Sequence, residues 1–102
     1  MSGQEQKQFE FVSGSNDHHS VEQGKYGVIH NQGIISTVGL SLCIGVSIYS
    51  SYEKTAYLGH FDAESYTTGG AFDQMIKDAR ENIKQLGNIK IWLAVAYCYP
   101  KV

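Results

Sequence analysis

The sequence of 102 residues predicts an α/β (α+β) fold, a small layered sandwich in which a mainly antiparallel sheet carries one long helix at about residues 70–86. Between Leu42 and Tyr49, aliphatic residues alternate with small or polar ones, which is the period of a half-buried strand. From Ala71 onward, apolar residues recur at steps of three and four, which is the period of one helical face. These two periods predict both kinds of element in one compact unit.

The length of the chain fits one domain. Hydrophobic residues make up 42% and charged residues 18%, which is typical of a globular domain. Residues 1–25 are predicted to form a polar, partly flexible lead-in, because Ser, Gln, Glu, Gly, Asn, Asp and His dominate there. Residues 26–102 are predicted to form the single domain.

Charge and hydropathy argue against two classes of protein. The net charge of −2 argues against a general nucleic-acid-binding protein, which normally carries a basic stripe. No apolar run approaches the roughly 18 residues that a membrane span needs, so we expect no membrane insertion. The polar N-terminus lacks the apolar segment of a signal peptide. These features favour the cytoplasm, with secretion of an effector without a classical signal peptide as the alternative.

The polar lead-in contains one candidate edge strand, at 8–12, where two phenylalanines alternate with a glutamate. His18 and His19 follow in a loop. Adjacent histidines with no Cys, Asp or Glu at ligand spacing are weak grounds for a metal site, so we expect no metal.

Two apolar runs, 26–29 and 34–37, are separated by Asn31-Gln32-Gly33, which predicts a turn because Asn and Gly tolerate positive φ. The second run leads into an alternating strand that ends at Tyr49. In this strand the large aliphatic side chains share one face and the small or polar ones share the other. The first face comprises Leu42, Ile44, Val46 and Ile48, and the second comprises Cys43, Gly45, Ser47 and Tyr49.

A hairpin connection at 50–53 returns the chain into a strand at 55–61. If the two strands pair symmetrically about residues 51–52, Cys43 lies directly opposite His60. Directly opposed residues have Cβ atoms about 4.5–5.5 Å apart, which is close enough for a thiol–imidazole pair. The face with His60 also carries Leu58, and the opposite face carries Tyr57, Gly59 and Phe61.

The predicted helix has one apolar face, formed by Phe72, Ile76, Ala79, Ile83 and Leu86. The last apolar run, 89–98, is nearly continuous after Lys90. Such a run is typical of a strand that is central or covered on both faces.

Cys43 and His60 are the candidate nucleophile and base. A thiol is a weak nucleophile until it is ionised, and an imidazole within hydrogen-bond reach can take its proton. Backbone N–H groups around Cys43 are candidates for stabilising an oxyanion. The structural alternative is that the cysteine packs as a small hydrophobe and that the histidine lies on the surface. We interpret Cys98, in the last run, as structural.

The stretch from Thr37 to His60 resembles the chemoreceptor glutamine deamidase (CheD) family. That family carries a core of the type T-x-G-L-x-x-C-[VI]-x-V-x-[LI]-Y-D and a histidine seventeen residues after the cysteine. The matching residues here are Thr37, Gly39, Leu40, Cys43, Ile44, Val46, Ile48, Tyr49 and His60. Deamidases of the cytotoxic necrotizing factor type share the arrangement on an α/β/β sandwich.

The resemblance implies a protein glutamine deamidase with Cys43 as nucleophile, His60 as general base and acid, and Thr37 as the third polar member of the site. It implies a protein substrate, a thioester intermediate, release of ammonia, and no metal or organic cofactor. We expect the residues beside the thiol and the imidazole to contact the substrate: Ser41, Leu42, Phe61 and Asp62.

Two other functions stay open, as does the oligomeric state. One is a non-catalytic protein-interaction module that binds through an edge rich in tyrosines: Tyr52, Tyr57, Tyr66, Tyr97 and Tyr99. The other is a related Cys–His acyl-transfer enzyme, such as a transglutaminase or an N-terminal asparagine amidohydrolase.

Overall fold

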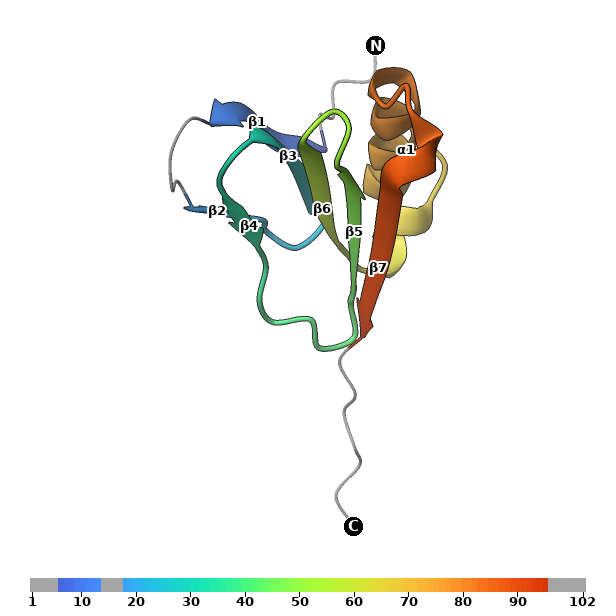
Figure 1. The fold of residues 1–102 in the computed structure, drawn as a ribbon. Coiled ribbons are helices and arrows are strands. Elements are labelled where there is room, and N and C mark those ends of the chain that lie inside the picture. The colour runs from blue at the N-terminus through green and yellow to red at the C-terminus, as the bar shows by residue number, and fades with distance from the viewer. Residues whose placement is uncertain (1–5, 14–17, 96–102) are drawn as a thin grey trace.

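The computed structural model describes residues 6–13 and 18–95. Seven strands and one α-helix follow one another along the described chain (Figure 1). The strands are β1 (Lys7–Ser13), β2 (His18–Ser20), β3 (Lys25–Asn31), β4 (Ile34–Ser36), β5 (Ile44–Ser50), β6 (Thr55–Phe61) and β7 (Ile89–Val95). The helix is α1 (Ala71–Asn82), and two short 3₁₀ turns, η1 (Ala63–Tyr66) and η2 (Leu86–Asn88), flank it.

The elements form three layers. The central sheet has the order β1-β3-β6-β5-β7, and it is antiparallel except for the β1–β3 pair. Helix α1 packs on one face against β3 and β6, and the small parallel sheet of β2 and β4 lies against the same two strands (Figure 1). Because α1 covers the face of Tyr57 and Phe61, whereas residue 37 after β4 contacts His60, the helix and the small sheet lie on opposite faces. The predicted layered α+β sandwich is confirmed.

The hydrophobic core lies between the central sheet and α1. Its members are Tyr26, Val28, Val46, Ile48, Tyr57, Phe61, Ala71, Met75, Ala79 and Ile83. On β6, Tyr57 and Phe61 are fully buried in this core. The predicted division of β6 into two faces is therefore confirmed, and His60 belongs to the face away from the helix.

The helix is shorter than predicted, because it ends at Asn82 and not near residue 86. Ile83 has extended dihedral angles (φ −96°, ψ 113°) and is buried in the core. The backbone N–H of Lys84 donates to Glu53 Oε2 at 2.7 Å instead of continuing the helical ladder. A tertiary hydrogen bond therefore competes with the last helical turn.

The buried stripe of α1 also differs from the predicted one. The fully covered positions are Ala71, Met75 and Ala79, with Ile83 just beyond the end. Phe72 and Ile76 are only partly buried and pack beside this stripe. The periodic pattern also included the partly buried apolar residues on the side of α1 toward β5 and β7. The predicted apolar face is therefore rotated about the helix axis relative to the buried stripe.

Strand β5 begins at Ile44, and the preceding residues form a tight turn instead of a continuous strand. The N–H of Cys43 donates to the carbonyl of Leu40 at 2.7 Å. Leu42 has a φ of 62° and is 87% exposed, so it does not belong to the predicted aliphatic face. Ile44, Val46 and Ile48 do face the core.

The predicted register of the β5–β6 hairpin is wrong by two residues. The last pair before the turn is Ser50 with Thr55, and Gly45 lies opposite His60. The connection spans four residues, 51–54, one position later than predicted, and its last residue, Lys54, adopts a left-handed conformation (φ 53°). Cys43 is therefore a diagonal neighbour of His60 and not its direct partner.

Strand β7 is an edge strand and not a central one, which corrects the prediction from its composition. It pairs with β5 on one side only. Ile91, Trp92, Leu93 and Val95 are each more than half exposed. A nearly continuous apolar run is compatible with either position, and strand pairing determines which one is taken.

The segment predicted as a polar lead-in contributes two strands. β1 pairs in parallel with β3 at the other edge of the central sheet, which confirms the predicted edge strand at 8–12. β2 pairs with β4. The division into lead-in and domain stays a prediction, and residues 7–13 share the sheet of the predicted domain. In the described part of the chain, no helix is long and apolar enough to cross a membrane.

Candidate active site

His60 is hydrogen-bonded through one ring nitrogen, and its other ring nitrogen has no partner among the described residues. The residue is 3% exposed. Its Nδ1 lies 2.8 Å from Thr37 Oγ1, and that hydroxyl donates its proton to the carbonyl of Val21 at 2.7 Å. Because a threonine hydroxyl has a single proton, Thr37 must accept from His60 Nδ1–H. The neutral imidazole therefore carries its lone pair on Nε2.

His60 Nε2 is buried and has no hydrogen-bond partner among the described residues. Buried polar atoms in native structures are usually paired, so an unpaired one needs an explanation. The other such ring nitrogen in the described chain is His19 Nε2, and that ring stacks on Phe11 with centroids 4.3 Å apart. The two cases differ because the other ring nitrogen of His60 is hydrogen-bonded to Thr37, which shortly precedes the turn that holds Cys43.

The small β2–β4 sheet positions Thr37. Val21, which follows β2, donates its N–H to the carbonyl of Ser36, the last residue of β4, at 2.8 Å. Thr37 comes next in the chain, over the face of β6 that carries His60. This layer therefore orients the imidazole through the Thr37 hydroxyl.

Cys43 is 5% exposed and lies where the Leu40–Cys43 turn joins β5. It precedes Ile44, whose partner on β6 is Phe61, so it lies one diagonal step from His60. Diagonal neighbours on paired strands lie about 7–8 Å apart, which is within the reach of an aromatic ring such as that of His60. The N–H of Cys43 itself is donated within the turn, and the role of the neighbouring backbone N–H groups toward an oxyanion stays a prediction.

Tyr66, in η1, packs on Phe61 and Phe72 on the helix side of the sheet, with ring centroids 5.9 and 5.2 Å apart. Burial raises the pKa of its phenol, and the negative charges of ionised Cys43 and of Asp62 raise it further. A charge on the Cys43 sulfur is therefore felt at Tyr66. The tyrosine follows His60 closely in the chain.

The four predicted substrate-contacting residues fall into three groups. Ser41 and Leu42 are exposed in the turn before Cys43, so they are accessible to a substrate. Phe61 is fully buried in the core on the helix side, so the prediction that it contacts a substrate is wrong. The alternation of β6 turns it away from the face of His60.

Asp62 is occupied by local hydrogen bonds. It is the N-cap of η1 and accepts from the backbone and the hydroxyl of Ser65 at 3.0 and 2.9 Å. Gln23 Nε2 donates to its other oxygen at 3.2 Å. The hydrogen bonds from Gln23 and Ser65 hold the pKa of Asp62 below its ordinary value. Asp62 therefore fixes the loop after His60.

A shallow apolar hollow of about 240 Å³ adjoins this site. Its lining residues are Ser36, Thr37, Leu40, Gly45, Ser47, Leu58, Trp92 and Ala94. A Cβ atom at Gly45 would lie 3.3 Å from Leu40, so glycine permits the loop to fold over β5 there. The small-residue face of the alternating run was the sequence signal for this hollow.

Other predicted features lie away from the site or outside the described residues. Cys98, Tyr97 and Tyr99 fall in the undescribed C-terminal residues. Tyr57 is fully buried, so the predicted tyrosine-rich edge does not include it. Within the described ranges, no group of three or more His, Cys, Asp and Glu residues is arranged to hold a metal ion.

Comparison with family models, with curated proteins and with solved structures finds no match to this chain.

Proposed function

We propose that this protein is a Cys–His amide hydrolase that converts a glutamine side chain of a protein substrate to glutamate. The observation that carries the proposal is the state of His60, whose Nδ1–H is bonded to Thr37 while its buried Nε2 has no partner among the described residues. An imidazole fixed in this tautomer is suited to accept a proton from a nearby thiol.

The reaction balances with Cys43 and His60 alone. His60 Nε2 takes the thiol proton, and the thiolate attacks the carboxamide carbon. The imidazolium returns the proton to the departing nitrogen, so ammonia leaves and a thioester remains. His60 then removes a proton from water, which attacks the thioester and releases the carboxylate, and the sulfur regains its proton.

The position of Thr37 supports this assignment in a second way. An imidazolium formed in the first step keeps its Nδ1–H bond to the hydroxyl, so the ring does not have to reorient between the two half-reactions. The exposed turn at Ser41 and Leu42 leaves the approach to Cys43 next to solvent. A glutamine on a flexible segment is the substrate that such an approach favours.

The test uses a Cys98→Ser background, so that Cys43 is the single thiol. With β-casein as a flexible, glutamine-rich probe, we expect ammonia release that Cys43→Ser and His60→Gln abolish, while circular dichroism shows that both variants fold. Ser47→Ala, on the same face of β5, is the matched control. Full activity in Cys43→Ser rejects the nucleophile.

A second measurement does not depend on the choice of substrate. If His60 accepts the thiol proton, His60→Gln slows alkylation of Cys43 by iodoacetamide about tenfold or more at neutral pH, because the thiolate is the reactive form. An unchanged rate contradicts the proposal. Incorporation of a primary amine into casein in place of ammonia release identifies a transglutaminase instead.

A further inference from the structure

Helix α1 covers only part of the helix-side face of the central sheet. It packs mainly on β6 and β3, with further contacts to β1. A helix is about 10 Å wide and strands lie about 4.8 Å apart, so one helix covers about two strands. The β5–β7 half of this face therefore has room for one more helix beside α1.

An apolar groove of about 470 Å³ runs between α1 and β7. Its lining residues are Ile48, Ile76, Ala79, Arg80, Ile83, Lys84, Ile89 and Ile91. On β7, Leu93 and Val95 extend the same face and are 69% and 58% exposed. A contiguous exposed apolar patch on a folded protein is typical of an interaction site.

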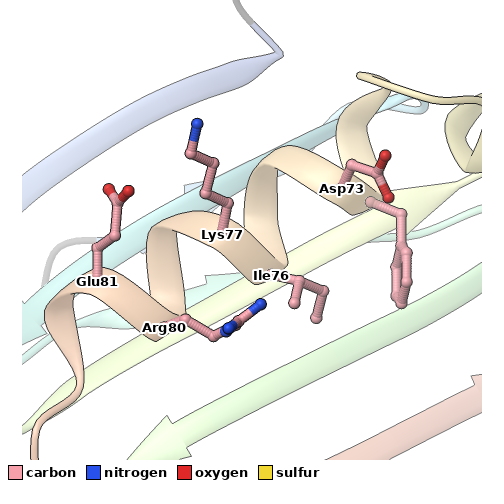
Figure 2. Close-up of a pocket in the computed structure, with 6 residues that line it drawn as sticks. Asp73, Ile76, Lys77, Arg80 and Glu81 are labelled. Carbon is pink, nitrogen blue, oxygen red and sulfur yellow. The ribbon is translucent and has the colours of Figure 1, made fainter.

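A separate hollow on α1 shares Ile76 and Arg80 with the groove and also carries the carboxylates of Asp73 and Glu81. Figure 2 shows Ile76 and Arg80 on the side of α1 toward β5 and β7, whereas Lys77 and Glu81 point to the opposite side. A helix bound in the groove would therefore contact apolar side chains at its base, with Arg80 beside them.

The ionisable side chains that line the groove are both cationic. Within the described chain, Arg80 makes no ion pair or hydrogen bond. Lys84 Nζ donates to the carbonyl of Glu81 at 2.7 Å, which leaves its charge without a carboxylate. A partner with carboxylates at the edge of its apolar face complements this rim.

We propose that the groove between α1 and β7 binds an amphipathic helix of a partner protein, with apolar residues on the groove floor and acidic residues facing Arg80 and Lys84. Helix-in-groove binding uses anchors at i, i+3, i+4 and i+7, and a helix seated beside α1 presents them to Ile83, Ile91 and Leu93 in turn. The groove lies on the face of the sheet opposite His60, so the proposal does not depend on amide hydrolysis.

The test is fluorescence anisotropy with the full chain and a labelled model peptide that has Leu at i, i+3, i+4 and i+7, Ala elsewhere, and Glu on both flanks. We expect saturable binding, about tenfold weaker for Arg80→Glu and for a matched peptide with Lys in place of Glu. Lys77→Glu, on the opposite side of α1, is the matched control and is expected to change affinity by less than about twofold.

Absent binding, or equal binding of the Glu and Lys peptides, overturns the proposal. Sedimentation of the protein without peptide measures whether it forms a dimer. A dimer that Ile76→Glu dissociates means that a second copy of the chain occupies the groove, which also overturns it. Arg80 is exposed, so its substitution is expected to leave thermal unfolding unchanged.

Discussion

Thr37 accepts a hydrogen bond from His60 across two layers of the structure, with 2.8 Å between Oγ1 and Nδ1. The threonine follows the short strand β4, and the histidine lies in the central strand β6. Because the hydroxyl gives its own proton to the carbonyl of Val21, the direction of this bond is fixed. The direction fixes the tautomer of His60 and leaves Nε2 as the basic nitrogen.

Replacing Thr37 by valine is expected to release this tautomer. We expect ¹⁵N spectra of the wild-type imidazole to show neutral Nδ1–H, and those of Thr37→Val to show a mixture. A general base typically contributes about 10²- to 10⁴-fold, and the valine variant loses the correct tautomer in only part of its molecules, so hydrolysis is expected to fall about 10- to 100-fold. Thr37→Ser retains the hydroxyl and is the control. A wild-type ring protonated at Nε2 contradicts the assignment.

Tyr66 reports on the charge of Cys43. Burial, the charge of the thiolate and Asp62 together raise the pKa of the phenol. Removing the thiolate in Cys43→Ser is therefore expected to lower the Tyr66 pKa toward its ordinary value. The ¹³C signal of the Tyr66 ring followed against pH measures the change, and Tyr66→Phe identifies the signal. An unchanged midpoint means that the two groups do not interact.

Leu42 occupies a left-handed conformation that favours glycine (φ 62°). A side chain in this region costs about 1–2 kcal/mol, and glycine loses about 0.4–1 kcal/mol through the unfolded chain. Leu42→Gly is therefore expected to raise the free energy of unfolding by about 0.5 kcal/mol in urea denaturation. Ser41→Gly, in the same turn without a positive φ, is expected to lower it. Destabilisation by both would show that no strain is relieved.

Met75 is the residue of α1 with no exposed surface in the helix–sheet interface. Met75→Ala leaves a cavity under β6 and is expected to lower the free energy of unfolding by about 2–5 kcal/mol. Lys77→Ala, which is exposed on the same helix, is expected to stay within about 0.5 kcal/mol of the wild type. Comparable losses in both variants are incompatible with the packing of α1 described above.

Glu10 couples the pairing of β1 with β3 to pH. Lys7 donates to Glu10 Oε1 at 2.9 Å, and His30 Nε2 lies 2.6 Å from its other oxygen. These bonds hold the Glu10 pKa below its ordinary value, Lys7 contributing most. A depressed carboxyl pKa stabilises the fold above the unfolded-state pKa, and that contribution is lost as pH falls through the folded-state pKa.

The loss is therefore expected below about pH 4.5. Urea denaturation of the wild type and of Glu10→Gln should show a stability difference at about pH 6 that shrinks toward about pH 3. The side chain is 42% exposed, so the difference is expected to be modest. A difference that is constant over this range contradicts the coupling.

The local features of the fold, such as the faces of a strand and the position of a turn, could be predicted from short sequence patterns. Alternation places Tyr57 and Phe61 on one face of β6 and His60 on the other, because side chains of a strand point to opposite faces in turn. The turn at 31–33 follows from the tolerance of Asn and Gly for positive φ, and both residues have it (φ 72° and 127°). These outcomes need no knowledge of distant residues.

The arrangement of the candidate site depends on contacts between segments that are far apart in the chain. The register places Gly45, and not Cys43, opposite His60, because the four-residue hairpin connection lies one position later than predicted and ends at a left-handed Lys54. Strand order left β7 at an edge although its composition is that of a covered strand. The residues of a single strand specify neither its register nor its neighbours in the sheet.

Thr37 shows the same division for a single residue. The resemblance to the deamidase motif singled it out in the sequence, but its partner atom depends on how β2 and β4 pair and fold over the central sheet. The direction of its hydrogen bond follows from the carbonyl of Val21, sixteen positions away. Periodicity specifies which way a side chain faces, whereas packing of separate segments specifies what it meets there.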